Sequence, residues 1–255
     1  MNVFEKIILG IVQGLTEFLP VSSSGHLFLF EEVIFKKSVD LPFDVFLHIA
    51  TLFAVLIFFR KKLWELSHGF FQARGTSERI FVGKLALATL VTVPIALTIE
   101  PYIRNGEPPK IIALELIITG ICILLAEFFS PKSIREFSWK MAFLVGIFQG
   151  IAAFAGISRS GITIAFLLLA GGERKKSVEI SFLLSIPVIF GAFIFEFPKI
   201  YSAISLNINE FLWGGIFAFF SAFFAIWGMM RYIQKYWKWF SVWCFAVAGA
   251  LLFFG

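Results

Sequence analysis

Two short polar segments interrupt apolar stretches of the chain and carry residue types that phosphoryl chemistry uses. The first is a run of three serines at 22–24, with Glu17 before it and His26 after it. The second, 158–161, contains Arg159 between two serines. A serine next to a base can become a nucleophile, and a guanidinium suits bidentate contact with phosphate. These segments therefore predict a site for an anionic, phosphate-bearing ligand.

Four side chains are predicted to be catalytic: Glu17, Ser23, His26 and Arg159. Glu17 lies four residues after Gln13, so both share a helical face, and Glu17 could ligate a divalent metal or act as a general base. His26 lies one turn after Ser23 and could activate it, attack phosphorus itself or protonate a leaving group. The alternative for Glu17 and Arg159 is a structural ion pair.

Each polar segment is also predicted to start a new helix, whose free N–H groups and positive dipole end favour an anion. The predicted phosphate-binding residues are Ser22, Ser24, Gly25, Ser158, Arg159, Ser160 and Gly161. A simpler interpretation, in which Ser22 and Ser158 are only N-caps, leaves Arg159 unexplained. Asp44 and His48, spaced i, i+4, are predicted to support the site or to form a local hydrogen-bonded pair.

The composition places these segments in a membrane protein. Of the 255 residues, 59% are apolar and 15% are charged, whereas soluble domains have about half and about a quarter. This composition excludes a soluble enzyme, a disordered protein and a nucleic-acid binder. The net charge of +5 is attributed to cytoplasmic loops, so no nucleic-acid partner is expected.

The hydropathy pattern predicts one all-α polytopic membrane domain over 1–255. Six stretches have the length and low charge of a membrane-spanning helix: about 42–60, 80–100, 111–129, 178–197, 211–230 and 237–254. Two further apolar stretches, 4–19 and 141–154, end at the polar segments and are followed by short ones at 26–35 and 162–170. Because each half is too short to span, we expect six transmembrane helices and two re-entrant helical hairpins.

The two interrupted stretches resemble each other at a constant offset of 136 residues. The matching positions in the first stretch are Gly10, Ile11, Gln13, Gly14, Phe18, Ser22, Ser24 and Gly25. This similarity predicts an internal duplication, with repeat 1 at about 1–130 and repeat 2 at about 136–255. Three spans per repeat is an odd number, so the second repeat must enter from the opposite side, as in inverted-topology repeats.

The basic residues predict the orientation, because Lys and Arg concentrate in cytoplasmic loops. One set of loops holds Arg60, Lys61, Lys62, Arg74, Arg79, Lys132, Arg135, Lys140, Arg174, Lys175, Lys176, Arg231, Lys235 and Lys238. The opposite set holds only Lys6, Lys36, Lys37, Arg104, Lys110 and Lys199. Both termini are then outside. His68 is expected in a polar loop, and Trp64, Trp139 and Trp237 are expected in an interfacial belt.

Three segments of the sequence resemble one known family. QGLTEFLPVSSSGHL (Gln13 to Leu27) is similar to the first signature of the bacterial undecaprenyl pyrophosphate phosphatases of the bacitracin-resistance type. GISRSG (Gly156 to Gly161) is similar to the second signature, and FDVFLHIATLFAVL (Phe43 to Leu56) to the first span. The spacing agrees as well, so the resemblance covers nearly the whole chain.

The resemblance implies hydrolysis of undecaprenyl pyrophosphate, a polyprenyl pyrophosphate lipid, to undecaprenyl phosphate and inorganic phosphate, which recycles a lipid carrier for cell-wall synthesis. It also implies a divalent cation, Mg²⁺ or Ca²⁺, and a bacterial cytoplasmic membrane among whose lipids the site opens to the outer face. Glu17, Ser23, Ser24, His26 and Arg159 fall on the family's functional positions, with Ser158 and Ser160 flanking them. Whether Ser23 or His26 attacks phosphorus stays open.

Two positions depart from the family pattern. Gln13 stands where many members have a glutamate, so it is at most a weaker second metal ligand beside Glu17. Ala155 stands where the second signature usually has proline.

Broken helices in inverted repeats are also typical of transporters, so the alternative function is transport of undecaprenyl phosphate across the membrane. The oligomeric state, a homodimer included, is not fixed by the sequence.

Overall fold

The fold is described from a computed structural model that covers residues 1–38, 41–72, 75–103, 106–206 and 208–255. Arg74 and Arg104, two of the basic residues used to predict the orientation, lie outside these ranges. All secondary-structure elements among the described residues are helices, without a strand. In order, the helices are α1 (Val3–Phe18), α2 (Ser23–Phe28), a π-helical turn (Leu29–Ile34), α3 (Leu41–Phe58), α4 (Arg60–Phe71), α5 (Thr76–Ile103), α6 (Pro109–Phe129), α7 (Trp139–Ile151), α8 (Arg159–Leu169), α9 (Arg174–Leu206), α10 (Ile208–Tyr236) and α11 (Trp239–Phe254).

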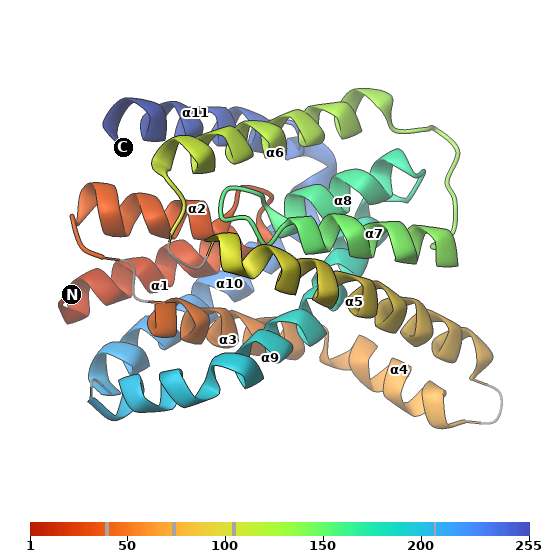
Figure 1. Cartoon of the computed structure of the whole chain (residues 1–255). Helices are drawn as coiled ribbons and strands as arrows, with labels where there is room; N and C mark the ends of the chain where they lie inside the picture. The colour runs from red at the N-terminus through yellow and green to blue at the C-terminus, as the bar shows by residue number, and fades with distance from the viewer. Residues whose placement is uncertain (39–40, 73–74, 104–105, 207) are drawn as a thin grey trace.

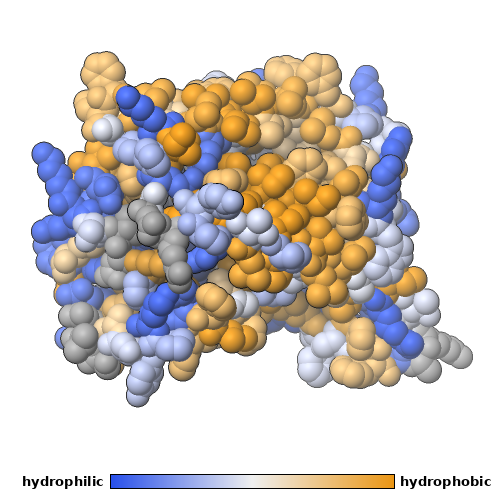
Figure 2. Space-filling model, viewed as in Figure 1, coloured by the Kyte–Doolittle hydropathy of each residue, from blue (hydrophilic) through white to orange (hydrophobic). Residues whose placement is uncertain are grey.

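Five of these helices, α3, α5, α6, α9 and α10, are long and apolar enough to cross a membrane. Figure 2 shows a broad apolar surface between two more hydrophilic ends, as expected for a protein that lies in a bilayer. The chain is therefore a multi-pass, all-α membrane protein. The last predicted span, 237–254, corresponds to α11, which has 16 residues and is shorter than a usual span.

Two helical hairpins, α1–α2 and α7–α8, reach into the molecule from opposite ends, and their tips meet near its middle (Figure 1). In the first, α1 ends at Phe18, and Pro20 follows it. Ser22 then caps α2 by accepting the Gly25 N–H at 3.2 Å. At the second tip Ser158 caps α8 through the Gly161 N–H at 3.0 Å. The two tips thus repeat the same cap at the same offset.

Two local expectations are wrong. The segment around His68 is the helix α4 rather than a loop, and it carries apolar residues such as Leu66 on its buried side. Trp237 is fully buried and donates its indole N–H to the Ile123 carbonyl at 3.0 Å, so it is no member of an interfacial belt. Trp64 and Trp139 are exposed, as a belt requires.

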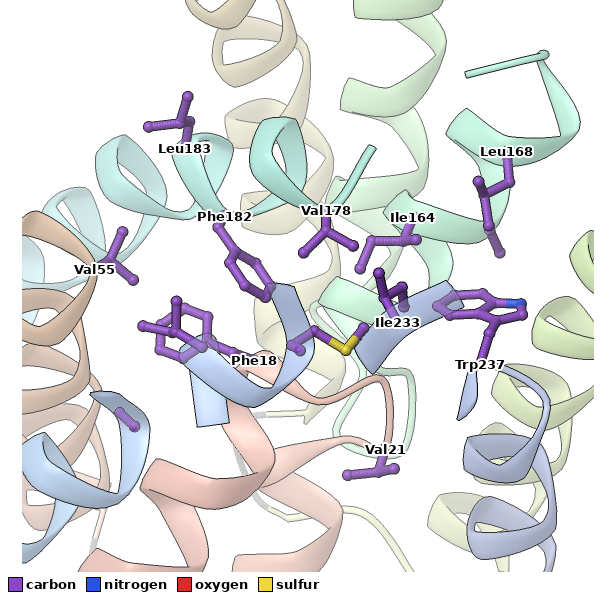
Figure 3. Packing of buried hydrophobic residues seen from close by; sticks show 14 of the residues in the cluster. Phe18, Val21, Val55, Ile164, Leu168, Val178, Phe182, Leu183, Ile233 and Trp237 are labelled. Carbon is purple, nitrogen blue, oxygen red and sulfur yellow. The ribbon is translucent and has the colours of Figure 1, made fainter. Parts of the chain in front are cut away.

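The largest apolar cluster lies directly behind the first tip and fixes its position (Figure 3). Phe18 and Val21 of that tip belong to this cluster, together with Ile164 of α8 and Phe182 of α9. The Phe18 and Phe182 rings are 5.1 Å apart, edge to face. Aromatic pairs of this kind contribute about 0.5–1.5 kcal/mol beyond burial. The cluster therefore joins both hairpins to the long helices.

The first hairpin is also held by a close crossing of α1 over α10. At Gly10 an added Cβ would lie 2.2 Å from the Gly214 carbonyl oxygen. The neighbouring atoms are backbone, so they cannot move aside as a side chain would. Glycine at this position therefore allows the two helices to touch and sets the depth of the first tip.

We expect Gly10→Ala to destabilise the protein by about 1–3 kcal/mol, the usual cost of overpacking. Thermal unfolding in detergent, followed by tryptophan fluorescence, measures this. The matched control is Gly228→Ala in α10, where an added Cβ meets nothing within 4 Å. The control should keep or slightly raise the melting temperature, since alanine favours helix over glycine. Equal melting temperatures for both variants would contradict the close crossing.

Candidate active site

Glu17 is the centre of a buried polar cluster at the end of α1. One carboxylate oxygen, Oε2, accepts hydrogen bonds from Ser23 Oγ at 2.7 Å and from Gln13 Nε2 at 2.9 Å. The other, Oε1, pairs with the guanidinium of Arg159. A buried carboxylate is tolerated only when it is paired and hydrogen-bonded, and Glu17 meets both conditions. The structure thus brings Glu17, Ser23 and Arg159 together, as the sequence predicts.

One guanidinium nitrogen of Arg159 is free to donate a hydrogen bond to a ligand. Its Nη2 binds Glu17, whereas its Nη1 is buried and has no hydrogen-bond partner within the described ranges. A buried, unpaired guanidinium nitrogen costs free energy unless an acceptor arrives. Arg159 can therefore bind an anionic oxygen without releasing Glu17, which reconciles the ion-pair and ligand-binding interpretations.

The two hairpin tips hold each other through backbone oxygens. Ser22 Oγ donates to the Ala155 carbonyl, and Ser160 Oγ donates to the Leu19 carbonyl at 2.9 Å. The polar segments therefore satisfy each other's backbone, which irregular chain at membrane depth requires.

A cavity of about 250 Å³ opens beside this cluster. Its polar lining comprises Glu17, Ser22, Ser23, Ser24, His48, Thr92, Gln149, Ser158 and Arg159. Its apolar lining includes Ala96 of α5 and Ala192 of α9. The predicted residues Gly25, Ser160 and Gly161 do not line it: the Gly25 and Gly161 amides bind the cap serines, and the Ser160 hydroxyl binds the other tip.

Four backbone N–H groups at the helix starts have no acceptor among the residues described. They belong to Ser23 and Ser24 in the first tip and to Arg159 and Ser160 in the second. Three of these four residues line the cavity. Free amides at a helix start can bind an anion, as the sequence suggests.

His48 of α3 lines the cavity and lies next to Glu17, so its position is not limited to supporting other residues. Its Nδ1 is 2.8 Å from the backbone oxygen of Asp44, so this nitrogen carries a proton. Its Nε2 is 3.4 Å from Glu17 Oε2 and faces a second acceptor. An imidazolium satisfies both contacts at once. The expected i, i+4 pair exists, although it uses the Asp44 backbone rather than its carboxylate.

His26 is not brought into the cavity. It is buried, with Nδ1 2.6 Å from the Ser22 carbonyl oxygen and Nε2 2.8 Å from the indole Nε1 of Trp243. Ser23 turns to Glu17 instead, so the predicted shared face of Ser23 and His26 does not produce a contact.

The second tip is held by α6 and the residues before it. Thr119 Oγ1 accepts the Ser158 N–H at 3.0 Å and donates to the Gly156 carbonyl at 3.3 Å. Glu115 accepts the Gly156 N–H at 2.8 Å, and Glu107 accepts the Ala155 N–H at 2.8 Å. Proline, usual at position 155 in the family pattern, has no N–H, so the Glu107 contact depends on the alanine.

Two buried glutamine side chains have oxygen atoms of the type that binds divalent cations. Gln13 and Gln149 occupy equivalent repeat positions, and each uses its amide nitrogen, toward Glu17 and Thr92 respectively. Both Oε1 atoms are buried with no partner in the described part of the chain. Amide and carboxylate oxygens suit Mg²⁺ and Ca²⁺. No group of three His, Cys, Asp or Glu side chains gathers among the described residues, so substrate oxygens and water would complete a cation's shell.

Three residues that contact the site or its supports, Trp243, Thr119 and Gln149, were not predicted from the sequence. Trp243 and Thr119 lie in apolar spans, where nothing in the local pattern marks a contact with a distant tip. Gln149 was noted only as a repeat match, yet this match was a usable signal, because a buried amide needs a polar neighbour.

The fold and the site define an integral membrane protein with a polar cavity between two helical hairpins. Residues 6–250 match the family described as bacitracin resistance protein BacA. The chain is 36% identical over 254 residues to the undecaprenyl-diphosphatase of Methanococcus vannielii, covering 98% of this chain and 99% of that protein. It is 38% identical to the undecaprenyl-diphosphatase of Halothermothrix orenii, covering 92% and 91%. The chain belongs to the BacA family, which confirms the resemblance found in its motifs.

We expect Thr119→Val to lower the melting temperature in detergent by several degrees. The nearly isosteric valine leaves the Ser158 N–H and the Gly156 carbonyl buried without Thr119, at about 1–3 kcal/mol for each unsatisfied group. Thr98→Val is the control, because the exposed Thr98 hydroxyl only donates within its own helix. An unchanged melting temperature for Thr119→Val would show that α6 does not hold the second tip.

Proposed function

We propose that this protein is an undecaprenyl-diphosphatase that releases inorganic phosphate from undecaprenyl diphosphate and leaves undecaprenyl phosphate. The observation that carries this function is the buried Glu17 carboxylate, which binds the Ser23 hydroxyl and the Arg159 guanidinium at one cavity. A nucleophile, a base and an anion-binding cation thus converge on one point. The family and the names of its relatives agree with this reaction.

In the proposed topology, six spans and two re-entrant hairpins form an inverted repeat in the bacterial cytoplasmic membrane. The constant offset of 136 residues and the hairpins' approach from opposite ends support this arrangement. The excess of basic loops on one side puts both termini outside. The site then opens to the outer face, where the diphosphate lies at the membrane surface. A homodimer is compatible with this arrangement.

The prenyl chain would leave the cavity between α5 and α9. Small side chains, Ala96 and Ala192, line the cavity on this side. Next to them Leu97 and Phe190 are exposed on the same helices and would face lipid. A long apolar tail can therefore stay in the bilayer while its charged head reaches Arg159.

The proposed reaction begins with in-line attack of Ser23 Oγ on the terminal phosphorus. Glu17 Oε2 takes the serine proton along the 2.7 Å hydrogen bond. The bond from this phosphorus to the bridging oxygen breaks, and undecaprenyl phosphate leaves. His48, next to Glu17, is the group that can give the leaving oxygen a proton when its Nε2 carries one. Water then attacks the phosphoserine: His48 takes a proton from this water, inorganic phosphate leaves, and Glu17 returns its proton to the serine oxygen, which restores all three side chains.

Arg159 and the unpaired amides stabilise the charge that builds on the equatorial oxygens, which is the main task in phosphoryl transfer. Removing one such donor typically costs about 10²–10³ in rate. We further propose that Glu17, with Gln13 as a weaker ligand, holds a divalent cation, Mg²⁺ or Ca²⁺. Such a cation, when bound, would neutralise phosphate charge and orient the diphosphate.

The test is phosphate release from undecaprenyl diphosphate by purified protein, with and without Mg²⁺ or Ca²⁺. Ser23→Ala, Glu17→Gln and Arg159→Lys should each lower the rate by at least about 10², measured on the protein that remains folded in detergent. The control is Ser67→Ala, on exposed α4, which should keep full activity. Folded protein that binds the lipid but releases no phosphate would refute the phosphatase and favour a carrier-lipid transporter.

Gln13→Glu tests the cation's position. A second carboxylate beside Glu17 adds charge to the ligand set, so we expect half-maximal activity at a cation concentration about tenfold lower. Titration of activity with Mg²⁺ and Ca²⁺ measures this. The matched control is Gln149→Glu at the equivalent repeat position, which distinguishes a site at Glu17 from a general gain of negative charge in the cavity. An equal effect of both substitutions would place the cation elsewhere.

A further inference from the structure

The last helix, α11, touches the first hairpin tip at two adjacent residues. Trp243 donates its indole N–H to His26 Nε2 at 2.8 Å. The next residue, Cys244, is fully buried and places its Sγ 3.5 Å from the Pro20 carbonyl oxygen. Helix α11, more than 200 residues away in sequence, thus contacts the first tip on both sides of Ser23, at Pro20 and at His26.

The contact with Trp243 fixes the protonation of His26. An indole nitrogen can only donate, so the His26 Nε2 that it faces must be an acceptor without a proton. The Nδ1 then carries the ring's proton and donates it to the Ser22 carbonyl at 2.6 Å. The planes of the two rings are 5° from parallel and their centroids are 6.1 Å apart, which is compatible with an in-plane hydrogen bond. His26 is therefore a neutral imidazole with both nitrogens occupied.

The acceptor of the His26 proton is an unusual residue. Ser22 has a φ of +65°, in the left-handed region that residues with a Cβ rarely adopt. Such a conformation persists only when surrounding contacts hold it. His26 holds the Ser22 carbonyl, and the next residue along the chain is Ser23, whose hydroxyl must point at Glu17.

We propose that His26 is a positioning residue rather than the nucleophile or the acid–base group, and that Trp243 holds it in this role. In this arrangement Trp243 fixes the His26 tautomer, His26 fixes the Ser22 carbonyl, and the strained turn directs Ser23 to Glu17. Glu17 and His48 line the cavity beside Ser23, whereas His26 does not. The inference rests on the proposed phosphatase function.

The first experiment compares His26→Asn with His26→Ala and His26→Gln in the phosphate-release assay. The asparagine amide nitrogen takes the place of Nδ1 and can still donate to the Ser22 carbonyl, but it cannot carry a proton to or from substrate. We expect His26→Asn to be at least about tenfold more active than the other two, the rate equivalent of one buried hydrogen bond. Equal and complete loss in all three variants would overturn the proposal.

The second experiment replaces the indole donor. Trp243→Phe should lower kcat about tenfold, with little change in KM, because the tip is misplaced while the lipid contacts remain. Trp239→Phe is the matched control on the same helix, since Trp239 is 57% exposed and its ring lies beside Lys238. A fall in KM and kcat together, or an equal effect of both substitutions, would contradict the role given to Trp243.

Two direct readouts separate this proposal from the phosphatase function. Nitrogen NMR of protein with labelled histidine, assigned among three histidines by substitution, should show His26 with a proton on Nδ1 and none on Nε2. Rapid quenching with labelled substrate should trap acid-stable phosphoserine; acid-labile phosphohistidine at position 26 would overturn the proposal. If native protein releases no phosphate the phosphatase function fails, and a His26 protonated on Nε2 refutes the positioning role by itself.

Discussion

The ion pair between Glu17 and Arg159 is the interaction on which the rest of the structure depends. It joins residues 142 positions apart in the chain and lies buried between the two hairpin tips. Moving two charges out of water costs several kcal/mol for each ion, which is recovered only with close geometry and further hydrogen bonds. Ser23, Gln13 and His48 supply those bonds to Glu17. The contacts at the candidate site are thus also what allows the two charges to be buried.

Two broken helices need more support than two intact ones, and the surrounding elements provide it. Unpaired backbone is not tolerated in lipid, so every irregular residue must find a protein partner or a wet cavity. Thr119 and Glu115 serve the second tip, and α11 serves the first. The apolar cluster around Phe18 and Phe182 then joins both tips to the long helices. Helices α6 and α11 therefore contribute to the site without lining its cavity.

The membrane class, the helix breaks and the meeting of Glu17, Ser23 and Arg159 could all be predicted from the sequence. These features follow from local signals: hydropathy, a proline, cap serines and charges in apolar surroundings. The environment of His26 could not be predicted, because its partner Trp243 comes from a distant apolar span with no pattern that marks it. Likewise, i, i+3 spacing placed Ser23 and His26 on one face, but side-chain rotamers directed one hydroxyl to Glu17 and one ring to α11. Burial of Trp237 depends on tertiary packing in the same way.

The separation of Glu17 from Arg159 has a consequence for biosynthesis. The ribosome adds about 5–20 residues per second, so Glu17 is made roughly 7–28 seconds before its cationic partner Arg159. During that interval no second tip covers the first one, and its serines still contact water. The candidate site is therefore complete only when the second half of the chain, with Arg159 and Ser160, has been made.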